Sequence, residues 1–274
     1  MAKTVLITGA SSGIGKSIAQ YFHTKGWNVA ATMRKPSKEK ELTSLERVKL
    51  FRLDVLEEHT IHDALEGAKE QFGTIDVVVN NAGYGLVGAF EASAQEQVKR
   101  QFDTNVFGLM NVTRAILPYF RERKSGTIIN IASVGGRITF PLYSLYHGTK
   151  WAIEGFSESL QYELRQFGIK VKIVEPGAIK TDFYDRSMDL MEKKGLTAYD
   201  PYIDLAFSNI QEIGNKAPGP GIVAKKTYKA ATDGRWKMRY PVGSGAPTLL
   251  FIRRIIPNSW FFRAVRMVVE KKRK

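Results

Sequence analysis

The sequence predicts an α/β protein: a single domain built on a doubly wound parallel sheet with helices on both faces. Two observations carry this prediction. Short apolar runs rich in Val and Ile alternate with segments of helical length, and a glycine-rich turn joins the first run to the first helical segment. A chain of 274 residues can bury one substantial core, and no linker or repeat divides it, so we expect one domain over residues 1–274.

Six strands are predicted, and several of them are nearly continuous in apolar residues, as expected for strands covered on both faces. They are Thr4–Thr8, Val29–Met33, Val48–Leu53, Ile75–Asn80, Gly126–Ile131 and Val171–Glu175. Helical segments separate them at Gly15–Lys25, Glu57–Phe72, Gln95–Arg123 and Tyr146–Phe167. This alternation implies right-handed crossovers between parallel strands.

The pattern changes after Pro176. Residues 178–221 contain no clear strand and end in a Gly/Pro-rich stretch, and the chain closes with a basic, hydrophobic extension at about 246–274. Ligands bind beyond the carboxyl ends of the strands in open sheets, so we expect residues 178–221 to form a substrate lid. The alternative is an insertion that only packs against the domain.

Composition excludes several classes of site. The absence of cysteine rules out disulfides and thiolate metal ligands, and the four histidines lack the spacing of a zinc site, so we predict no metal. The first residues do not resemble a targeting signal, and no apolar stretch is long enough to span a bilayer. A cytoplasmic location is therefore expected.

The turn after the first strand holds three glycines, Gly9, Gly13 and Gly15, and a helical segment follows at once. Glycines at such a turn let the backbone approach a pyrophosphate at the positive N-terminus of the helix. This placement, rather than the glycines alone, indicates a Rossmann-type dinucleotide site.

The glycine spacing, together with Asn80-Asn81-Ala82-Gly83 and Pro176-Gly177, resembles the short-chain dehydrogenase/reductase superfamily in its single-domain branch, over about residues 3–243. The resemblance implies a dinucleotide-binding and catalytic domain in which Asp54 meets the adenine and Asn81 steadies the sheet. The cofactor-binding residues it implies are Gly9, Ser11, Ser12, Gly13, Ile14, Gly15, Thr32, Arg34, Asp54, Val55, Asn81, Ala82, Gly83, Tyr146, Lys150, Pro176, Gly177, Ile179 and Thr181.

The end of the second strand indicates which nicotinamide cofactor is preferred. An enzyme that selects NAD usually places an acid there to bind the ribose 2′-hydroxyl, but this strand ends in Arg34 and Lys35. A guanidinium suits a 2′-phosphate, so we predict NADP(H), with Arg34 as the main contact and Thr32 assisting. NAD(H) remains the alternative if both cations are solvated.

Tyr146 and Lys150 are four residues apart in a helical segment and therefore share one face. A nearby ammonium lowers the pKa of a phenol, which makes proton exchange feasible at neutral pH. Ser133 and Asn105 stand at the positions where the resembled family has its remaining catalytic residues, so the four resemble a complete tetrad. Tyr21 and Lys25 have the same spacing, but that helix runs away from the glycine turn.

These residues predict an NADP(H)-dependent oxidoreductase that interconverts a secondary alcohol and a ketone or aldehyde, with Tyr146 as acid and base. The substrate wall is expected to be bulky and apolar, which favours a hydrophobic alcohol or carbonyl compound. Its predicted residues are Tyr84, Leu86, Phe140, Tyr143, Phe183, Met188 and Leu190. The C-terminal extension makes the chain similar to hydroxysteroid and retinol dehydrogenases.

The family resemblance implies a homodimer or homotetramer formed through the helices at about 95–123 and 146–167. Residues 246–274 carry eight Lys or Arg and one Glu, about half of the net charge of +14. We expect this extension to pack against the body of the protein; contact with an anionic membrane surface is the less favoured alternative. Nucleic-acid binding is not expected, because no known binding module is present.

Two other functions are compatible with this fold. A non-catalytic NADP-binding sensor or scaffold protein would be expected to lack the tyrosine or the lysine, and this chain keeps both. An epimerase or enoyl reductase of the same superfamily is disfavoured by the glycine spacing and by the interval between Tyr146 and Lys150.

Overall fold

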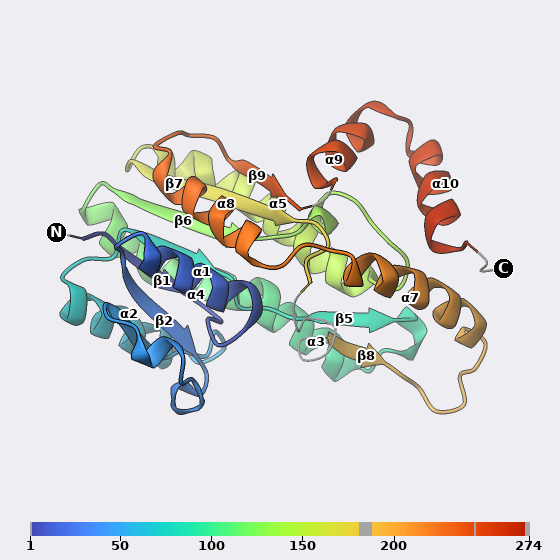
Figure 1. Cartoon of the computed structure of the whole chain (residues 1–274), viewed down its shortest axis with the longest axis horizontal. Helices are drawn as coiled ribbons and strands as arrows, with labels where there is room; N and C mark the ends of the chain where they lie inside the picture. Colours follow the sequence, from blue (N-terminus) through green and yellow to red (C-terminus); the bar gives the residue numbers. More distant parts are fainter. Residues whose placement is uncertain (1, 181–187, 244, 272–274) are drawn as a thin grey trace.

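The computed structural model describes residues 2–180, 188–243 and 245–271. Its centre is a parallel sheet of seven strands in the order β3-β2-β1-β4-β6-β7-β9 (Figure 1). The bounds are β1 Thr4–Ile7, β2 Asn28–Met33, β3 Val48–Arg52, β4 Val77–Asn80, β6 Gly126–Ile131, β7 Ile169–Pro176 and β9 Arg239–Val242. All six predicted strands are confirmed; β9 was not predicted.

Helices cover both faces of this sheet, which confirms the doubly wound architecture. One face is covered by α1 (Gly13–Thr24) and α8 (Gly221–Thr232), whose Ile18, Phe22 and Val223 are fully buried. The other face is covered by α2 (Glu58–Phe72), α4 (Gly108–Glu122) and α5 (Ser144–Arg165). The strand order reverses between β2-β1 and β4, so the crevice for a ligand opens at the carboxyl ends of β1 and β4.

The helical segment predicted at Gln95–Arg123 is not one continuous α-helix. It divides into α3 (Gln95–Phe102), a π-helical turn η4 (Asp103–Phe107) and α4. A π turn inserts one residue into a helix and re-aims the side chains that follow. Asn105 lies within this turn and is buried at 1 % exposure, so the irregularity directs an amide into the interior.

The prediction that residues 178–221 contain no strand is wrong. β8 (Met188–Met191) pairs in parallel with β5 (Gly85–Gly88), with Gly85 opposite Met188, and α7 (Asp200–Asn215) follows. Figure 1 shows this pair and α7 beyond the carboxyl ends of the central strands. The strands escaped prediction because each has four residues, and because the partners are about a hundred residues apart. The role of the segment as a lid stays a prediction.

The C-terminal extension forms two helices, α9 (Ala246–Ile255) and α10 (Asn258–Val269), with Pro257 between them. Leu250 and Phe261 are buried against Val134 and Ile138, so part of the extension packs on the domain as expected. The other short helices are η1 Pro36–Lys38, η2 Leu42–Ser44, η3 Phe90–Ala92 and η5 Val134–Gly136. Among the described residues, no helix is both long and apolar enough to cross a membrane.

Candidate active site

The glycine turn between β1 and α1 is built so tightly that side chains cannot enter it. Gly9 and Gly13 have φ values of +67° and +53°, in the region that favours glycine. A Cβ on Gly15 would lie 2.3 Å from the carbonyl oxygen of Gly9 and 2.4 Å from Nδ2 of Asn81. The turn therefore leaves a bare backbone at the N-terminus of α1, which fits a pyrophosphate.

Asn81 ties this turn to the end of β4. Its Nδ2 donates hydrogen bonds to the carbonyl oxygens of Thr8 (3.0 Å) and Gly9 (3.1 Å). Oγ1 of Thr8 accepts in return from the backbone N–H groups of Asn81 and Ala82, each at 3.0 Å. These bonds hold the ends of β1 and β4 together at the point where the strand order reverses, and they leave Gly83 at the mouth of the crevice.

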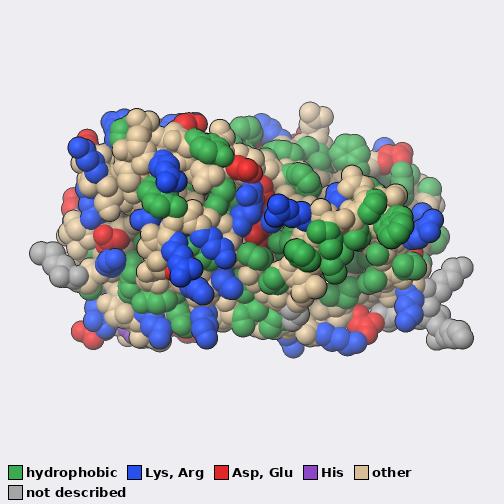
Figure 2. Space-filling model, turned by 90° about the horizontal axis from the view of Figure 1, so that it is seen from above, with side chains coloured by type: hydrophobic (Ala, Val, Ile, Leu, Met, Phe, Trp, Pro, Cys, Tyr) green, Lys and Arg blue, Asp and Glu red, His purple; other side chains and the backbone are tan. Residues whose placement is uncertain are grey.

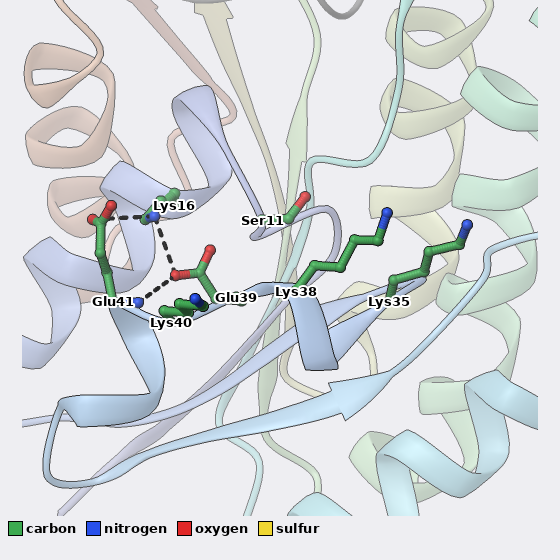
Figure 3. A pocket seen from close by; sticks show the side chains of 7 residues that line it. All are labelled: Ser11, Lys16, Lys35, Lys38, Glu39, Lys40 and Glu41. Carbon is green, nitrogen blue, oxygen red and sulfur yellow. Dashed lines mark hydrogen bonds and ion pairs between the residues drawn. The ribbon is translucent and has the colours of Figure 1, made fainter.

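The end of β2 borders a cavity of about 330 Å³ that contains more cations than the sequence analysis assigned. Its lining residues are Ser11, Lys16, Lys35, Lys38, Glu39, Lys40 and Glu41. Nζ of Lys16 lies 3.1 Å from both Glu39 and Glu41, whereas Lys35 and Lys38 extend side by side, away from that ion pair (Figure 3). The run of lysines after β2 was the signal that could have identified Lys38 and Lys40.

Thr32 and Arg34, the two cofactor contacts predicted at the end of β2, have different surroundings in the structure. Thr32 is fully buried and its hydroxyl donates to the carbonyl oxygen of Ile7 at 3.0 Å, so that group is committed to the sheet. Arg34 is exposed and does not line the cavity, whereas Lys35 does. Arg34 as the main contact therefore stays a prediction.

The remaining predicted cofactor residues lie at the same edge of the sheet. Oδ1 of Asp54 accepts a hydrogen bond from the backbone of Leu56 at 3.1 Å, which orders the turn after β3. Val55 and Ile179 are each 6 % exposed, and Gly177 is held by β9 through its backbone. Ser12, Ile14 and Pro176 take their places at the start of α1 and the end of β7. Thr181 lies outside the described residues.

Tyr146 and Lys150 lie on one face of α5, with Nζ of Lys150 5.6 Å from the centre of the Tyr146 ring. Lys150 is buried and donates a hydrogen bond to the carbonyl oxygen of Ile131 at 2.9 Å. Burial lowers the pKa of Lys150 to about 8, and the charge of Glu154 opposes this shift. Tyr146 is half-buried, so its ring reaches the surface of the crevice.

Ser133 and Asn105 converge on the same place. Oγ of Ser133 accepts from the backbone of Gly135 (3.0 Å) and donates to the carbonyl oxygen of Pro176 (3.3 Å). Ser133 follows two residues after Ile131, the acceptor for Lys150. Nδ2 of Asn105 donates to Oγ1 of Thr149 at 3.2 Å, and Thr149 precedes Lys150. The structure thus brings the four predicted catalytic residues to one edge of the sheet.

Asn105 also clamps the strand β5 at its base. Its Oδ1 accepts from the backbone N–H of Tyr84 (3.0 Å), and its Nδ2 donates to the Tyr84 carbonyl oxygen (2.8 Å). A Cβ on Gly83 would lie 3.0 Å from that Oδ1, so a side chain at this position would force the amide to shift. The π turn of η4 therefore aims Asn105 at both the catalytic helix and the segment before β5.

His147 contributes to the site although the sequence analysis gave it no role. Its Nε2 accepts a hydrogen bond from the backbone of Phe140 at 3.0 Å, which fixes the loop between η5 and α5. Burial lowers the pKa of His147 to about 4, so the ring is neutral at physiological pH. The rings of Tyr143 and Tyr146 lie 5.8 Å and 5.9 Å from it.

A buried ionic cluster lies one helical turn beyond Lys150. Glu154 on α5 and Glu175 on β7 are 5 % and 0 % exposed, and Arg239 on β9 binds Glu154 at 3.0 Å while Arg137 binds Glu175 at 3.2 Å. Burial and the neighbouring charge of Glu175 raise the pKa of Glu154 to about 7, and burial also raises the pKa of Glu175. Sequence reasoning missed this cluster because its members come from four separate segments: α5, β7, β9 and the end of η5.

The residues predicted to form the substrate wall differ in their positions in the structure. Tyr143 packs edge-on against Tyr146 at 6.1 Å, and Phe140 lies against α9 and α10. Leu86 is fully buried with Leu145 and Met191, so it serves as core between β5 and β8. The remaining predicted residues differ in placement: Tyr84 and Met188 are half-buried, Leu190 is exposed, and Phe183 lies outside the described residues.

Comparisons with known proteins agree with this architecture. The family model of the short chain dehydrogenases matches residues 3–190. The oxidoreductase YusZ of Bacillus subtilis, which is uncharacterised, is 36 % identical over 269 residues, covering 94 % of this chain and 95 % of its own. Retinol dehydrogenase 8 of Bos taurus is 32 % identical over 271 residues, covering 93 % and 86 %. The solved structure of ElxO with NADP bound has a TM-score of 0.75 at 29 % identity, covering 90 % of this chain and all of the other.

The chain belongs to the short-chain dehydrogenase/reductase family, as the sequence analysis predicted. It is accordingly an oxidoreductase that acts on CH–OH groups with a nicotinamide cofactor. The glycine turn, the Asn81 clamp and the bare backbone at Gly83 fit such a cofactor along the carboxyl edge of the sheet.

Proposed function

We propose that this protein interconverts a hydrophobic secondary alcohol and the corresponding ketone or aldehyde, with NADP(H) as the preferred cofactor and Tyr146 as acid and base. The observation that carries the proposal is the position of Lys150. This lysine is buried beneath the ring of Tyr146 and anchored on the strand that leads to Ser133. Lys150 could serve cofactor binding in a sensor as well, but proton exchange by Tyr146 at neutral pH requires an ammonium beside the phenol.

Each side chain has a defined task in this mechanism. The nicotinamide cofactor supplies or accepts the hydride. Ser133 holds the substrate oxygen by a hydrogen bond as charge develops on it, and Tyr146 donates the proton to that oxygen in reduction or removes it in oxidation. The ammonium of Lys150 stabilises the phenolate of Tyr146, and Asn105 positions the helix that carries both.

The preference for NADP(H) is supported by charge at the end of β2. Lys35 and Lys38 line the same cavity as Ser11 of the glycine turn, and no acid stands at the strand end itself. Glu39 and Glu41, the two acids of the cavity, are both paired with Lys16. A 2′-phosphate on the adenosine ribose would find cations there, whereas a 2′-hydroxyl would find no carboxylate acceptor at the position typical of NAD enzymes.

A hydrophobic substrate is supported by the side chains around Tyr146. Tyr143 stands edge-on to it, and Phe140 continues toward the apolar inner side of α9 and α10. The similarity to retinol dehydrogenase 8, whose name specifies a lipophilic alcohol, points the same way.

Replacing Tyr146 by Phe tests the proposal. Oxidation of NADPH, followed at 340 nm with a panel of hydrophobic ketones and aldehydes, should fall about a hundredfold or more in Tyr146→Phe, because the proton donor is lost. The dissociation constant for NADPH should stay unchanged. Tyr21→Phe is the matched control, since Nζ of Lys25 lies 5.4 Å from the Tyr21 ring in a nearly identical pair far from the site. Full turnover by Tyr146→Phe refutes the assignment, and NADPH binding without turnover by the unmodified protein favours the sensor.

A further inference from the structure

The C-terminal helices expose seven large apolar side chains, although their inner sides are packed. Leu250, Phe261 and Val269 are between 2 % and 5 % exposed, whereas Trp260 is 68 % and Met267 66 % exposed. We call the exposed part of these two helices the hairpin surface. Its apolar members are Phe251, Ile252, Ile255, Trp260, Phe262, Met267 and Val268. Soluble surfaces seldom gather so many large apolar groups in two short helices, so a partner is indicated.

Arginines are interleaved with these apolar side chains on the same helices: Arg253, Arg254, Arg263 and Arg266. Figure 2 shows hydrophobic and basic side chains together over the half of the molecule that holds α9 and α10. Arg253 lies over the rings of Phe261 and Phe262, at 5.2 Å and 5.8 Å from their centres. Among described residues, the one ion pair these arginines form is Arg266 with Glu270, at 3.1 Å.

This combination argues against a second copy of the chain as the partner. A symmetric contact through the hairpin surface would bring arginines close to arginines, because α9 and α10 contain no Asp or Glu and Glu270, at the end of α10, is already paired with Arg266. The chain also exposes Trp151 and Tyr162 on α5, which offers a second copy apolar surface elsewhere. Phosphate headgroups, in contrast, neutralise arginines, and the interfacial region of a bilayer accepts Trp and Phe side chains.

We propose that the hairpin surface docks on the headgroup region of a bilayer that contains anionic phospholipid. The two helices, of 10 and 12 residues, lie in the plane of the interface rather than crossing it. Their inner side packs on Val134 and Ile138, the residues that follow Ser133, so docking brings the active-site edge to the membrane. Delivery of a lipophilic substrate from the bilayer rests on the proposed function; the docking itself does not.

Co-sedimentation of the full-length protein with vesicles tests the proposal. Vesicles that mix phosphatidylglycerol with phosphatidylcholine should carry the protein down, and vesicles of phosphatidylcholine alone should retain at least about tenfold less. Phe251→Ser with Trp260→Ser, and separately Arg254→Glu with Arg263→Glu, should each weaken binding about tenfold or more. High salt should weaken it as well.

Trp236→Ser is the matched control for the apolar variant. Trp236 is 41 % exposed and lies beside two cations, with Arg165 at 4.8 Å and Lys170 at 5.2 Å, but it precedes β9 at the opposite edge of the sheet. Its variant should bind vesicles like the unmodified protein. Tyr146→Phe should do the same, so that loss of docking and failure of the proposed chemistry are distinguished.

Three outcomes would overturn the proposal. The first is equal binding to neutral and anionic vesicles, and the second is unchanged binding by both hairpin variants. The third is a fall in self-association of the hairpin variants, seen by sedimentation velocity, with no vesicle binding by the unmodified protein; that result would assign the hairpin surface to a second copy.

Discussion

Glu154, one helical turn beyond Lys150 on α5, has a buried carboxyl group. Burial and the charge of Glu175 raise the pKa of Glu154 in the folded protein to about 7, while Arg239 and Arg137 oppose this rise. The unfolded chain releases the same proton near pH 4.5. The folded state therefore binds more protons between these values, and stability falls as the pH rises through this window.

Glu154→Gln should remove this loss of stability at rising pH, because the glutamine side chain does not titrate. Relative to the unmodified protein, the free energy of unfolding of the variant should rise by on the order of 2 kcal/mol between pH 4.5 and pH 8. Denaturant titrations across this range measure the difference. His147, whose lowered pKa has the opposite effect between about 4 and 6.5, is common to both proteins and cancels. Glu158→Gln is the control, because Glu158 binds the same Arg239 but is 53 % exposed, and it should show no such change.

The cations after β2 permit a test of cofactor choice. Lys35→Ala combined with Lys38→Ala should lower kcat/KM for NADPH about tenfold or more, because charge-assisted contacts to the 2′-phosphate are lost, and should leave kcat/KM for NADH nearly unchanged. Lys25→Ala, at the distant end of α1, serves as control. Equal losses with both cofactors would count against a 2′-phosphate at this cavity. A loss of the preference for NADPH over NADH in Arg34→Ala alone would support the prediction that Arg34 is the main contact.

The spacing of Tyr146 and Lys150 indicated a shared helix face, and the family resemblance supplied Ser133 and Asn105. The structure brings these four residues to one edge of the sheet, while their catalytic roles stay predictions. Glu154 could not be recognised, because its burial depends on Glu175 and Arg239 from other strands. The role of His147 could not be recognised from the sequence, because it depends on a hydrogen bond from the backbone of Phe140 that forms only in the folded chain.

At the scale of elements, the glycine turn is the most constrained piece of backbone. Gly15→Ala should lower the free energy of unfolding by about 2 kcal/mol and weaken NADPH binding at least about tenfold, because the new Cβ would collide with Gly9 and Asn81. Thermal unfolding and calorimetric titration measure the two effects. Gly221→Ala should show neither, since a Cβ on Gly221 meets nothing within 4 Å. Normal NADPH binding by Gly15→Ala would mean that the turn relaxes more easily than its packing indicates.

The elements that could be predicted are those with local signals. Apolar runs rich in Val and Ile identified most of the six predicted strands, because burial on both faces demands apolar residues throughout; β3, which carries Lys49 and Arg52, has no fully buried residue. β9 was missed because it is a short edge strand with Arg239 and Pro241 in it, and β5 and β8 were missed because only their pairing makes them strands. A helical period does not reveal the π turn at Asn105, since one extra residue leaves the apolar pattern nearly intact.

At the scale of the whole molecule, the glycine turn after β1, the start of α5, the β5–β8 pair and the C-terminal helices gather beyond the carboxyl ends of the strands (Figure 1). A homodimer or homotetramer stays a prediction of the family resemblance, and Trp151 and Tyr162 on α5 supply exposed apolar surface for it. Four arginines of the C-terminal extension, Arg253, Arg254, Arg263 and Arg266, lie on α9 and α10, the helices that pack beside Val134.

The hydrogen bonds of Asn105 connect α5, which carries Tyr146 and Lys150, to the segment before β5. β5 starts directly after Tyr84 and pairs with β8, so the predicted lid segment is attached to Asn105, a predicted catalytic residue. A substrate that displaces β8 should therefore also displace Asn105, whose amide donates a hydrogen bond to Thr149 on α5. We therefore expect substrate binding at the β5–β8 pair and proton transfer at Tyr146 to depend on each other through Asn105.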